Sequence, residues 1–499
     1  MNDQASQALG RPKARLPRGF LDTTGKTLAI QEQLIGKLAA VYASYGFDRL
    51  ATPSIEFADA LGKFLPDQDR PHEGVFSFQD DDGQWLVMRY DLTAPLARYV
   101  AENFDTLAFP YRRFQTGLVF RDEKPGPGRF REFVQFDADT VGTASMLADA
   151  EFCMLLADSL EALGLARGEY IVKVNNRKVL TGMLESIGVP AGPEGDATRL
   201  TVLRAMDKLD RLGIKGVGQL LGGGRKDESG DFTKGAGLAT KEIDRVLGFL
   251  QAEGGDRAAV CTSMMGALKG SAIAEQGAAE LLEIDAALTA AGFGLDRVRF
   301  DQSIIRGLGY YTGPVFEAEL NFEIKDDEGR PIRYGSVGGG GRYDNLVERF
   351  LGKKVPATGA SIGVSRLSAA LEMRGLLSGK THLGPVVILV LDRDQLGRYQ
   401  AMVSELRAND IRAELYLGQA GMRAQLKYAD KRAAPIVVIE GGDERAKGEV
   451  TLKDMALGAE LSGEIKSRAE WAKGAASQVS IKRDDLIPRI REILGRHGS

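Results

Sequence analysis

At 499 residues the chain is longer than one hydrophobic core usually serves, so we expect two to four domains. Its hydrophobic fraction of 43% and charged fraction of 27% are those of a globular protein and exclude extensive disorder and a fibrous protein. The net charge of −4 argues against a dedicated nucleic-acid coat, although RNA binding needs only a local basic surface. Without a run of about 18 apolar residues or an apolar core in Met1–Gly10, the sequence predicts a cytoplasmic protein with no signal peptide and no membrane partner.

The first part of the chain is predicted to form a helix followed by an antiparallel sheet. Leu28–Tyr45 has apolar residues at helical spacing and is followed by a glycine, so we expect a helix there. Asp48–Pro53 is predicted to be a strand. Further short extended runs are separated by glycine, proline and charge, which is typical of antiparallel strands: Trp85–Met88, Pro110–Phe114, Leu118–Arg121 and Phe133–Asp139.

The middle of the chain is predicted to interrupt this sheet. A helix is expected over Thr143–Leu163, with Thr143 as its N-cap. From about Pro190 to Ala290, helical patterns such as Ala278–Ala291 alternate with the polar, glycine-rich stretch Gly222–Gly237, and we interpret this region as an inserted domain. Strand-like patterns then return, so the first sheet is expected to be completed after the insertion by Val298–Phe300, Val315–Leu320 and Ser336–Gly338.

After the polar connection Gly375–Gly384, strands and helices are predicted to alternate, which indicates an α/β domain. The expected strands are Val386–Leu391, Ile411–Leu415 and Ile436–Glu440. A helix is expected over Gly397–Asn409, and a second helix before the last strand.

Histidine and cysteine are too rare to carry the chemistry. The three histidines, His72, His382 and His497, are scattered, which leaves little material for a histidine-based triad or metal cluster. Cys153 and Cys261 are too sparse for a disulfide framework or a thiolate zinc site, and we expect both to be buried. Arginine, tyrosine and carboxylate side chains must therefore carry any chemistry.

A strongly basic loop lies between two predicted strands. Phe120–Gln135 contains Arg121, Lys124, Arg129 and Arg131. Guanidinium groups match phosphate oxygens, so this loop can fold over a triphosphate, although a solvated basic hairpin tip has the same composition.

Two further segments are rich in small residues. Gly339, Gly340, Gly341 and Arg342 form a candidate wall against a flat ligand, or alternatively a tight turn, and they lack the Lys-Ser/Thr of a phosphate loop. Gly359–Leu367 is predicted to be a strand that turns into a helix, where Arg366 can either meet a terminal phosphate or make surface contacts. Gly307, Gly309 and Gly313 have the wrong spacing for a dinucleotide fingerprint.

Taken in order, these segments resemble the signature motifs of class II aminoacyl-tRNA synthetases. Leu28–Pro53, Phe120–Gln135 and Gly359–Leu367 are similar to motifs 1, 2 and 3. Arg306–Thr312 and Gly339–Asp344 are similar to the two segments that are specific to the histidyl family. Shorter likenesses occur at Arg89–Pro95, Val174–Lys178, Asp207–Asp210 and Tyr428–Asp430.

The resemblance implies an α+β fold, in which a class II antiparallel-sheet catalytic domain carries a helical insertion and is followed by a C-terminal α/β anticodon-binding domain. We expect residues 1–190 and 291–375 to form the catalytic domain, residues 191–290 the insertion and residues 385–499 the anticodon-binding domain. A homodimer built through motif 1 is implied as well. Arg225, Lys226 and Lys234 of the insertion can touch the tRNA acceptor stem or lie in a solvated loop.

The resemblance also assigns a role to individual residues in the activation of L-histidine. Asp91, Thr93 and Gln135 would hold the α-ammonium group, which two oxygens and a carboxylate can satisfy. Asp139, Tyr310 and Tyr311 would bracket the imidazole. An amino acid without a ring N–H would leave these groups unpaired, which gives selectivity without editing.

For ATP, the resemblance implies that Arg121 and Arg306 contact the α-phosphate and act in catalysis, that Glu123 belongs to the ATP site and that Arg366 contacts the γ-phosphate. Mg²⁺ would bridge the outer phosphates, and its protein ligands are unknown. The resulting histidyl-adenylate would esterify the terminal ribose of the histidine tRNA.

The sequence departs from the family pattern at two positions, because Gly309 and Ser365 stand where acidic residues are usual. Two other functions are also considered. One is a histidine-binding regulatory paralogue that belongs to ATP phosphoribosyltransferase, and the other is a module that senses uncharged tRNA. The complete set of arginines and the C-terminal domain favour the enzyme over both.

Overall fold

The computed structural model describes residues 12–60, 74–126, 130–190, 192–226, 230–268, 270–305, 311–325, 329, 331–332, 334–377, 384–455, 457 and 477–496. Its contacts divide the chain into two compact units, Met1–Ser378 and Gly379–Ser499. Within the described residues, no helix is both long enough and apolar enough to cross a membrane.

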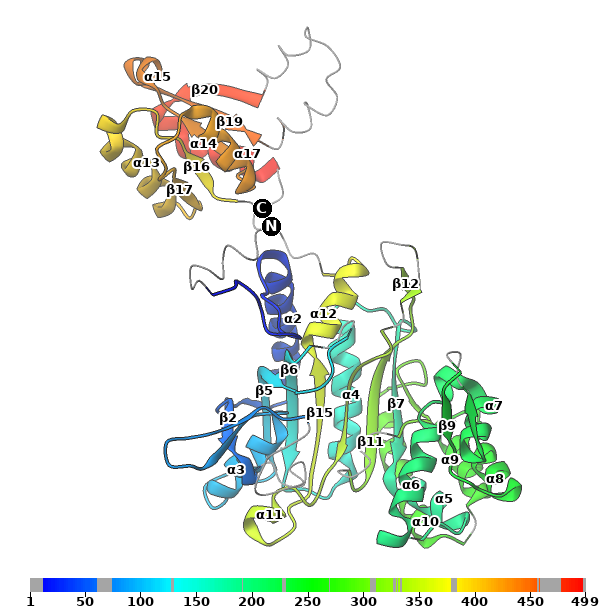
Figure 1. Cartoon of the computed structure of the whole chain (residues 1–499). Helices are drawn as coiled ribbons and strands as arrows, with labels where there is room; N and C mark the ends of the chain where they lie inside the picture. The colour runs from blue at the N-terminus through cyan, green and yellow to red at the C-terminus, as the bar shows by residue number, and fades with distance from the viewer. Residues whose placement is uncertain are drawn as a thin grey trace. The chain divides into compact units, whose positions relative to one another are not determined.

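An eight-stranded sheet forms the centre of the first unit (Figure 1). The two outer pairs, β1 with β5 and β7 with β10, are parallel, and every other pair is antiparallel. The predicted antiparallel sheet, completed after an insertion, is therefore confirmed. In spatial order the strands are β1 (Asp48–Arg49), β5 (Tyr111–Phe120), β6 (Glu132–Val141), β15 (Ala357–Gly363), β14 (Ser336–Arg342), β11 (Pro314–Leu320), β7 (Tyr170–Asn176) and β10 (Val298–Phe300).

One face of this sheet is buried under helices. Alternate strand residues such as Phe136, Ala360 and Phe316 point into a single core that these helices share. Because successive side chains on a strand point to opposite faces, their neighbours on each strand lie on the other face, which we call the open face. The covering helices are α2 (Gly25–Ser44), α4 (Met146–Ala162), α5 (Arg177–Ser186), α10 (Ala272–Ala290) and α12 (Val364–Met373).

Smaller elements flank the sheet. A three-stranded sheet consists of β2 (Ile55–Phe57), β4 (Trp85–Met88) and β3 (Ser77–Gln79), and α3 (Thr93–Glu102) follows it. Later in the chain come the two-stranded ribbon of β12 (Ile324–Lys325) and β13 (Pro331–Ile332) and the short helix α11 (Glu348–Leu351).

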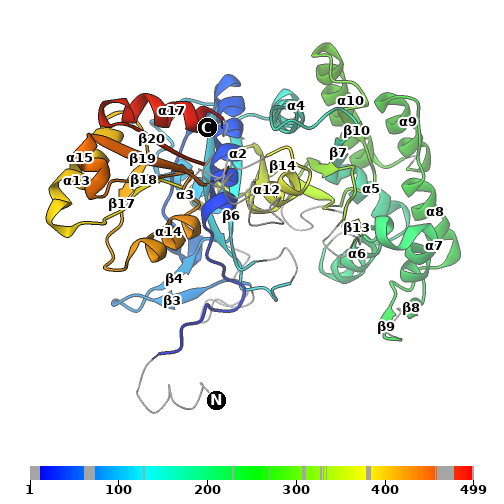
Figure 2. The same cartoon turned by 90° about the horizontal axis from the view of Figure 1, so that it is seen from above.

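The region predicted as an insertion is mainly helical and lies beyond β7 at one end of the sheet (Figure 2). Its residues Val217, Phe249 and Leu281 join the core of the first unit. The glycine-rich stretch within it contains a short antiparallel hairpin. The elements before α10 are α6 (Pro193–Met206), α7 (Leu209–Leu221), β8 (Gly224–Lys226), β9 (Phe232–Lys234), α8 (Thr240–Leu250) and α9 (Arg257–Ala267).

The second unit is the predicted α/β domain. Its five-stranded sheet has the order β17-β16-β18-β19-β20, in which the first three strands are parallel and the last two antiparallel. In chain order its main elements are β16 (Val386–Ile388), α13 (Leu396–Ala408), β17 (Ala413–Leu415), α14 (Met422–Lys431), β18 (Ile436–Ile439), α15 (Gly442–Lys447), β19 (Glu449–Asp454), β20 (Gln478–Lys482) and α17 (Leu486–Arg496).

Three local predictions were wrong. The two runs on either side of Thr116 form the single strand β5. The N-cap of α4 is Ser145, whose hydroxyl accepts a hydrogen bond from the Leu147 amide, and Thr143 instead accepts one from the Ser145 amide. Asp48–Pro53 is a strand only over its first two residues, because the Thr52 and Pro53 carbonyls accept hydrogen bonds from the Arg89 side chain instead of from a ladder.

Candidate functional site

Strand register places polar residues in two rows across the open face of the eight-stranded sheet. The first row runs from β5 to β7 through Arg113, Asp139, Gly359, Gly341, Val315 and Asn175. The second row, two residues along, consists of Gln115, Asp137, Ser361, Gly339, Glu317 and Lys173. The middle of the open face is therefore built from glycine and serine, between acidic residues on β6 and polar residues on β7.

Two buried carboxylates lie side by side on β6. Asp139 forms an ion pair of 2.6 Å with Arg113 and accepts a hydrogen bond from the Tyr343 hydroxyl. Asp137 is only 1% exposed, and among the described residues neither of its oxygens has a hydrogen-bond partner of normal geometry. Burial raises the pKa of Asp137 to about 7, although Arg113 and the nearby Ser361 hydroxyl act to lower it. Burial raises the pKa of Asp139 as well.

Other buried polar atoms gather around these two acids. Gln135 precedes Asp137 by two residues on the same face of β6, and its Oε1 has no hydrogen-bond partner within the described ranges. The same holds for Nε and Nη1 of Arg113, whose Nη2 donates to the Leu92 carbonyl. Buried polar groups are normally paired, so such a cluster of acceptors and donors indicates the floor of a site for a polar ligand.

The glycines of this floor make room for its functional side chains. A Cβ on Gly359 would lie 2.0 Å from Oδ1 of Asp139, and one on Gly341 would lie 2.9 Å from the Tyr311 ring. The glycine run is part of the central strand β14, so the alternative of a tight turn was wrong.

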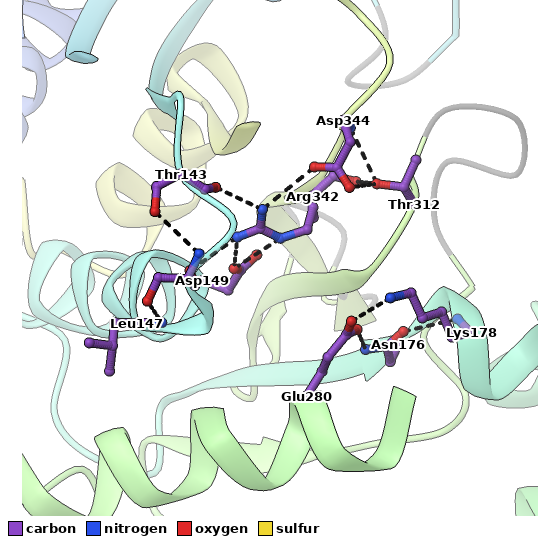
Figure 3. Close-up of polar contacts among 10 residues, drawn as sticks. Thr143, Leu147, Asp149, Asn176, Lys178, Glu280, Thr312, Arg342 and Asp344 are labelled. Carbon is purple, nitrogen blue, oxygen red and sulfur yellow. Dashed lines mark hydrogen bonds and ion pairs between the residues drawn. The ribbon is translucent and has the colours of Figure 1, made fainter. Parts of the chain in front are cut away.

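Arg342 does not belong to the predicted wall. It follows Gly341 on β14 and therefore points to the helix-covered face, where it is buried and forms an ion pair with Asp149 of α4. Its guanidinium also donates to the carbonyl of Thr143 (Figure 3). A further hydrogen bond runs to the carbonyl of Ser145. These contacts fix the start of α4, and they assign Arg342 a structural role. By the same alternation of strand residues, Gly340 lies on the covered face, while Gly339 and Gly341 lie on the open one.

Arg121 lies just beyond β5, where two aromatic rings hold its guanidinium. The group lies 4.4 Å from the ring centroid of Tyr90 and 5.1 Å from that of Phe133. The Tyr90 hydroxyl donates to Glu123 over 3.1 Å, so Arg121 and Glu123 are held together by one residue. The planar guanidinium is pre-oriented for a phosphate oxygen in this arrangement.

Asp91 and Thr93 lie at the start of α3. Oδ1 of Asp91 accepts hydrogen bonds from the amides of Thr93 and Ala94 over 3.0 and 2.9 Å. These two bonds, from just before α3, fix the carboxylate, and Asp91 is close enough to raise the pKa values of both Asp137 and Asp139. Asp91 thus lies near the two carboxylates of β6, and the roles assigned to Asp91, Gln135 and Asp139 stay predictions.

The segment that contains Arg306 and Tyr310 lies outside the described residues. Tyr311, just after it, is half-buried beside Gly341. Thr312 is fixed by its amide, which donates to the Arg342 carbonyl over 2.8 Å, and by its hydroxyl, which donates to Asp344 over 2.9 Å (Figure 3). Arg366 lies in the first turn of α12, as predicted, and donates to the Tyr334 carbonyl.

Sequence reasoning missed Arg113, Asp137 and Tyr343. A signal for Asp137 was present, because Gln135, Asp137 and Asp139 alternate with the apolar Phe136 and Ala138, which is the pattern of one polar strand face. For the other two, nothing in the sequence distinguishes a buried partner of Asp139 from an ordinary surface residue.

Comparison with known proteins gives a consistent result over nearly the whole chain. The model of the family described as histidyl-tRNA synthetase matches residues 19–367, and that of the anticodon binding domain matches residues 385–493. The histidine–tRNA ligase of Methylocella silvestris is 57% identical over 97% of this chain and 98% of its own length. That of Brucella ovis is 56% identical over 97% and 96%.

Solved structures have a similar fold. The histidyl-tRNA synthetase from Nostoc sp. PCC 7120 superposes with a TM-score of 0.69 and 27% identity, covering 97% of this chain and all of its own. A protein from Bacillus halodurans described as an ATP phosphoribosyltransferase regulatory subunit/histidyl-tRNA synthetase has a TM-score of 0.61 at 23% identity and covers 84% of this chain and 97% of its own. At that identity the second likeness concerns the fold alone.

Proposed function

Because the chain belongs to the histidyl-tRNA synthetase family and is a histidine–tRNA ligase, we propose that the open face of its eight-stranded sheet binds L-histidine and ATP and forms the adenylate there. The observation that carries this assignment is the group of buried polar atoms of Gln135, Asp137 and Arg113 that have no hydrogen-bond partner within the described part of the chain. A zwitterionic amino acid with an N–H-bearing ring supplies donors for these oxygens and an acceptor for the guanidinium.

The α-ammonium group of histidine is proposed to lie against Asp91, Thr93 and Gln135. The Asp91 carboxylate is held through Oδ1, which leaves Oδ2 to accept from a cation. Oε1 of Gln135 is a second buried acceptor. A cation with three N–H donors satisfies such acceptors at once, which compensates for the loss of its hydration.

The imidazole is proposed to lie over the glycine floor, between Asp139 and the two phenols of Tyr310 and Tyr311. Asp139 is fixed by Arg113 and Tyr343, and an ionised carboxylate can accept several hydrogen bonds at once. Asp137 adds a second acidic group on the same face of β6. A ring without an N–H would leave these oxygens buried and unpaired, so the pocket rejects it.

For adenylate formation, the histidine carboxylate attacks the α-phosphorus of ATP and pyrophosphate leaves. Arg121 and Arg306 are proposed to stabilise the negative charge that builds on the α-phosphate oxygens, with Arg366 at the γ-phosphate and Glu123 beside Arg121. No covalent enzyme intermediate is needed, because positioning and charge stabilisation suffice. The terminal ribose hydroxyl of the tRNA then attacks the histidyl carbonyl, and AMP leaves.

Mg²⁺ is proposed to arrive with the nucleotide. Across the described ranges no three histidine, cysteine or acidic side chains are grouped to hold a metal by themselves. Mg²⁺ does not require such a group, because it is usually held by one or two carboxylates together with substrate phosphates. We propose Glu123, which is held beside Arg121 through Tyr90, and Glu317, on the open face, as carboxylates for this purpose. The ion would neutralise charge on the outer phosphates.

We further propose that the enzyme works as a homodimer in the cytoplasm, where charged tRNA is used. The small sheet exposes a stripe of apolar side chains just after the motif 1 segment: Phe57, Leu86 and Phe78 are paired across its three strands, and Ile55 lies beside them. Phe57 is 49% exposed, and such a patch is typical of a protein interface. Light scattering tests this: we expect a dimer mass for the native chain and a lower mass for Phe57→Glu.

The decisive experiment for the reaction is exchange of labelled pyrophosphate into ATP, run with each amino acid in turn. We expect exchange with L-histidine alone. A folded protein that binds histidine without exchange would favour the regulatory paralogue. The match to an anticodon-binding domain at residues 385–493 argues for the enzyme, because charging a tRNA requires its recognition.

A further inference from the structure

Two adjacent asparagines at the end of β7 belong to a family-like segment, Val174–Lys178, for which the proposed reaction has no role. Asn175 faces the open side of the sheet and Asn176 the covered side, because neighbouring strand residues point in opposite directions. Both are buried, at 1% and 0% exposure. Their contacts nevertheless lead to two different parts of the molecule.

Asn175 holds the turn that precedes the Arg306 segment. Its Nδ2 donates to the carbonyls of Gln302 and Ile304 over 3.2 and 3.0 Å, so both of its amide hydrogens are used. Its Oδ1 accepts from the Asn176 amide over 2.8 Å, which fixes the orientation of the side chain. Ile304 precedes Arg306 by two residues, so these bonds fix the chain immediately before the segment.

The same turn is anchored on its other side. The Gln302 side chain is buried and donates to the carbonyls of Leu250 and Ala252, where α8 ends, over 2.9 and 2.7 Å. The Asp301 amide donates to the Val174 carbonyl over 2.9 Å. The turn is therefore held between β7 and the helical region.

The chain returns to β7 after the segment. The Arg177 amide donates to the Gly313 carbonyl over 2.9 Å, and Thr312 is tied to Arg342 and Asp344. Residues 304 and 313 are thus held at positions only two residues apart, by Asn175 near the end of β7 and by Arg177 at the start of α5. Fixing both ends of a short segment reduces the number of conformations that it can adopt.

We propose that Asn175 is a positioning residue for adenylate formation, because its amide holds Gln302 and Ile304, which precede the Arg306 segment in the chain. This inference rests on the proposed role of Arg306. Arg306 is four residues beyond Gln302, on the side of the segment that Asn175 holds, whereas Tyr311 adjoins the end that Thr312 holds. Loss of the Asn175 amide should therefore misplace the arginine more than the phenols.

The test uses Asn175→Asp and Asn175→Ala in the full-length enzyme. The aspartate keeps the oxygen that accepts from Asn176 but presents only acceptors to two carbonyls, and the alanine removes both functions. In pyrophosphate exchange, we expect kcat to fall between about 10- and 100-fold, the effect of a displacement of about 1 Å at a reacting group. The KM values for histidine and ATP should change by less than about threefold, since ground-state binding is retained.

Asn176→Ala is the matched control, because it changes the neighbouring residue of the same type and burial. Asn176 accepts from the Lys178 amide as the N-cap of α5 and donates to Glu280 (Figure 3). Its loss should lower the thermal midpoint and leave kcat near the native value. Thr312→Val is the second control: by loosening the other end of the segment, it should raise the KM for histidine more than it lowers kcat.

The outcomes separate this inference from the proposed function. If Arg306→Ala retains native kcat, the proposed role of Arg306 is wrong. If Arg306→Ala lowers kcat but folded Asn175→Asp does not, only the positioning inference is overturned. An equal loss of kcat in Asn176→Ala would also overturn it, because the effect would then follow from general destabilisation. If Asn175→Ala fails to fold, the nearly isosteric Asn175→Asp decides.

Discussion

Asp137 and Asp139 lie two residues apart on the same face of β6, yet among the described residues only Asp139 forms an ion pair with Arg113. Arg113 and Tyr343 hold Asp139 in place, whereas Asp137 is buried and interacts more weakly with Arg113 and the Ser361 hydroxyl, without an ion pair. The two carboxylates therefore differ in how much their ionisation costs, and this difference has consequences for stability and for substrate binding.

The stability of the protein should depend on the charge of Asp137. Burial raises its pKa to about 7, whereas an unfolded aspartate titrates near about 4. Between these values the folded state holds a proton that the unfolded state has lost, so stability falls as the pH rises. Asp137→Asn removes this titrating group. Between about pH 4 and pH 8, the free energy of unfolding of the variant should therefore rise by about 1–3 kcal/mol relative to that of the native protein.

Denaturant unfolding at several pH values measures this. The charged groups that influence Asp137, namely Arg113, Asp139 and Asp91, are unchanged in the variant, so they contribute equally to both curves. If plots of the free energy of unfolding against pH were parallel for the two proteins, Asp137 would not be protonated in the folded state at neutral pH.

Gly359→Ala should impair the recognition of histidine. The new Cβ would lie 2.0 Å from Oδ1 of Asp139 and 2.7 Å from the Ala138 carbonyl, so both the side chain and the strand must shift. We expect the KM for histidine to rise by about tenfold or more, with a smaller change in the KM for ATP.

A double-mutant cycle separates the two clashes. If Gly359→Ala acts through Asp139, then Gly359→Ala combined with Asp139→Ala should bind histidine no worse than Asp139→Ala alone. Fully additive losses would instead show that strain in β15 causes the defect.

Arg121→Lys should lower activity although the positive charge is kept. The ammonium group cannot reproduce the flat stacking against Tyr90 and Phe133 or offer two parallel donors to a phosphate. We expect kcat for pyrophosphate exchange to fall by about 10²-fold or more, with a smaller effect on the KM for histidine. Tyr90→Phe is the control: it keeps the ring but loses the hydrogen bond to Glu123, and a drop as large as that of Arg121→Lys would show that the hydroxyl, not stacking, positions the site.

Particular residues show what the sequence could and could not predict. Several strands and helices were predictable because apolar periodicity and turn residues are local signals, as for β4, β10 and α12. The face on which a residue lies was not readable for the glycine run, since glycine carries no side chain to reveal the pattern. Arg342 was therefore placed in the wall, whereas pairing of β14 with β15 turns it towards α4.

The role of Arg342 yields a further test. Arg342→Met leaves the buried Asp149 carboxylate without its cation, and breaking a buried pair in this way costs about 3–5 kcal/mol. Burial already raises the pKa of Asp149 to about 6, so without Arg342 the carboxyl group should be neutral at higher pH still. The variant should accordingly be least stable above neutral pH, where ionising Asp149 is most costly.

Replacing both partners tests the same assignment from the other direction. Arg342→Met combined with Asp149→Leu removes the uncompensated charge and should recover part of the lost stability, although the Thr143 and Ser145 carbonyls still lose their donor. Because Arg342 lies on the covered face, the folded double variant should keep native KM values for histidine and ATP. A large increase in either KM, with stability recovered, would return Arg342 to the ligand-binding wall and contradict the register of β14.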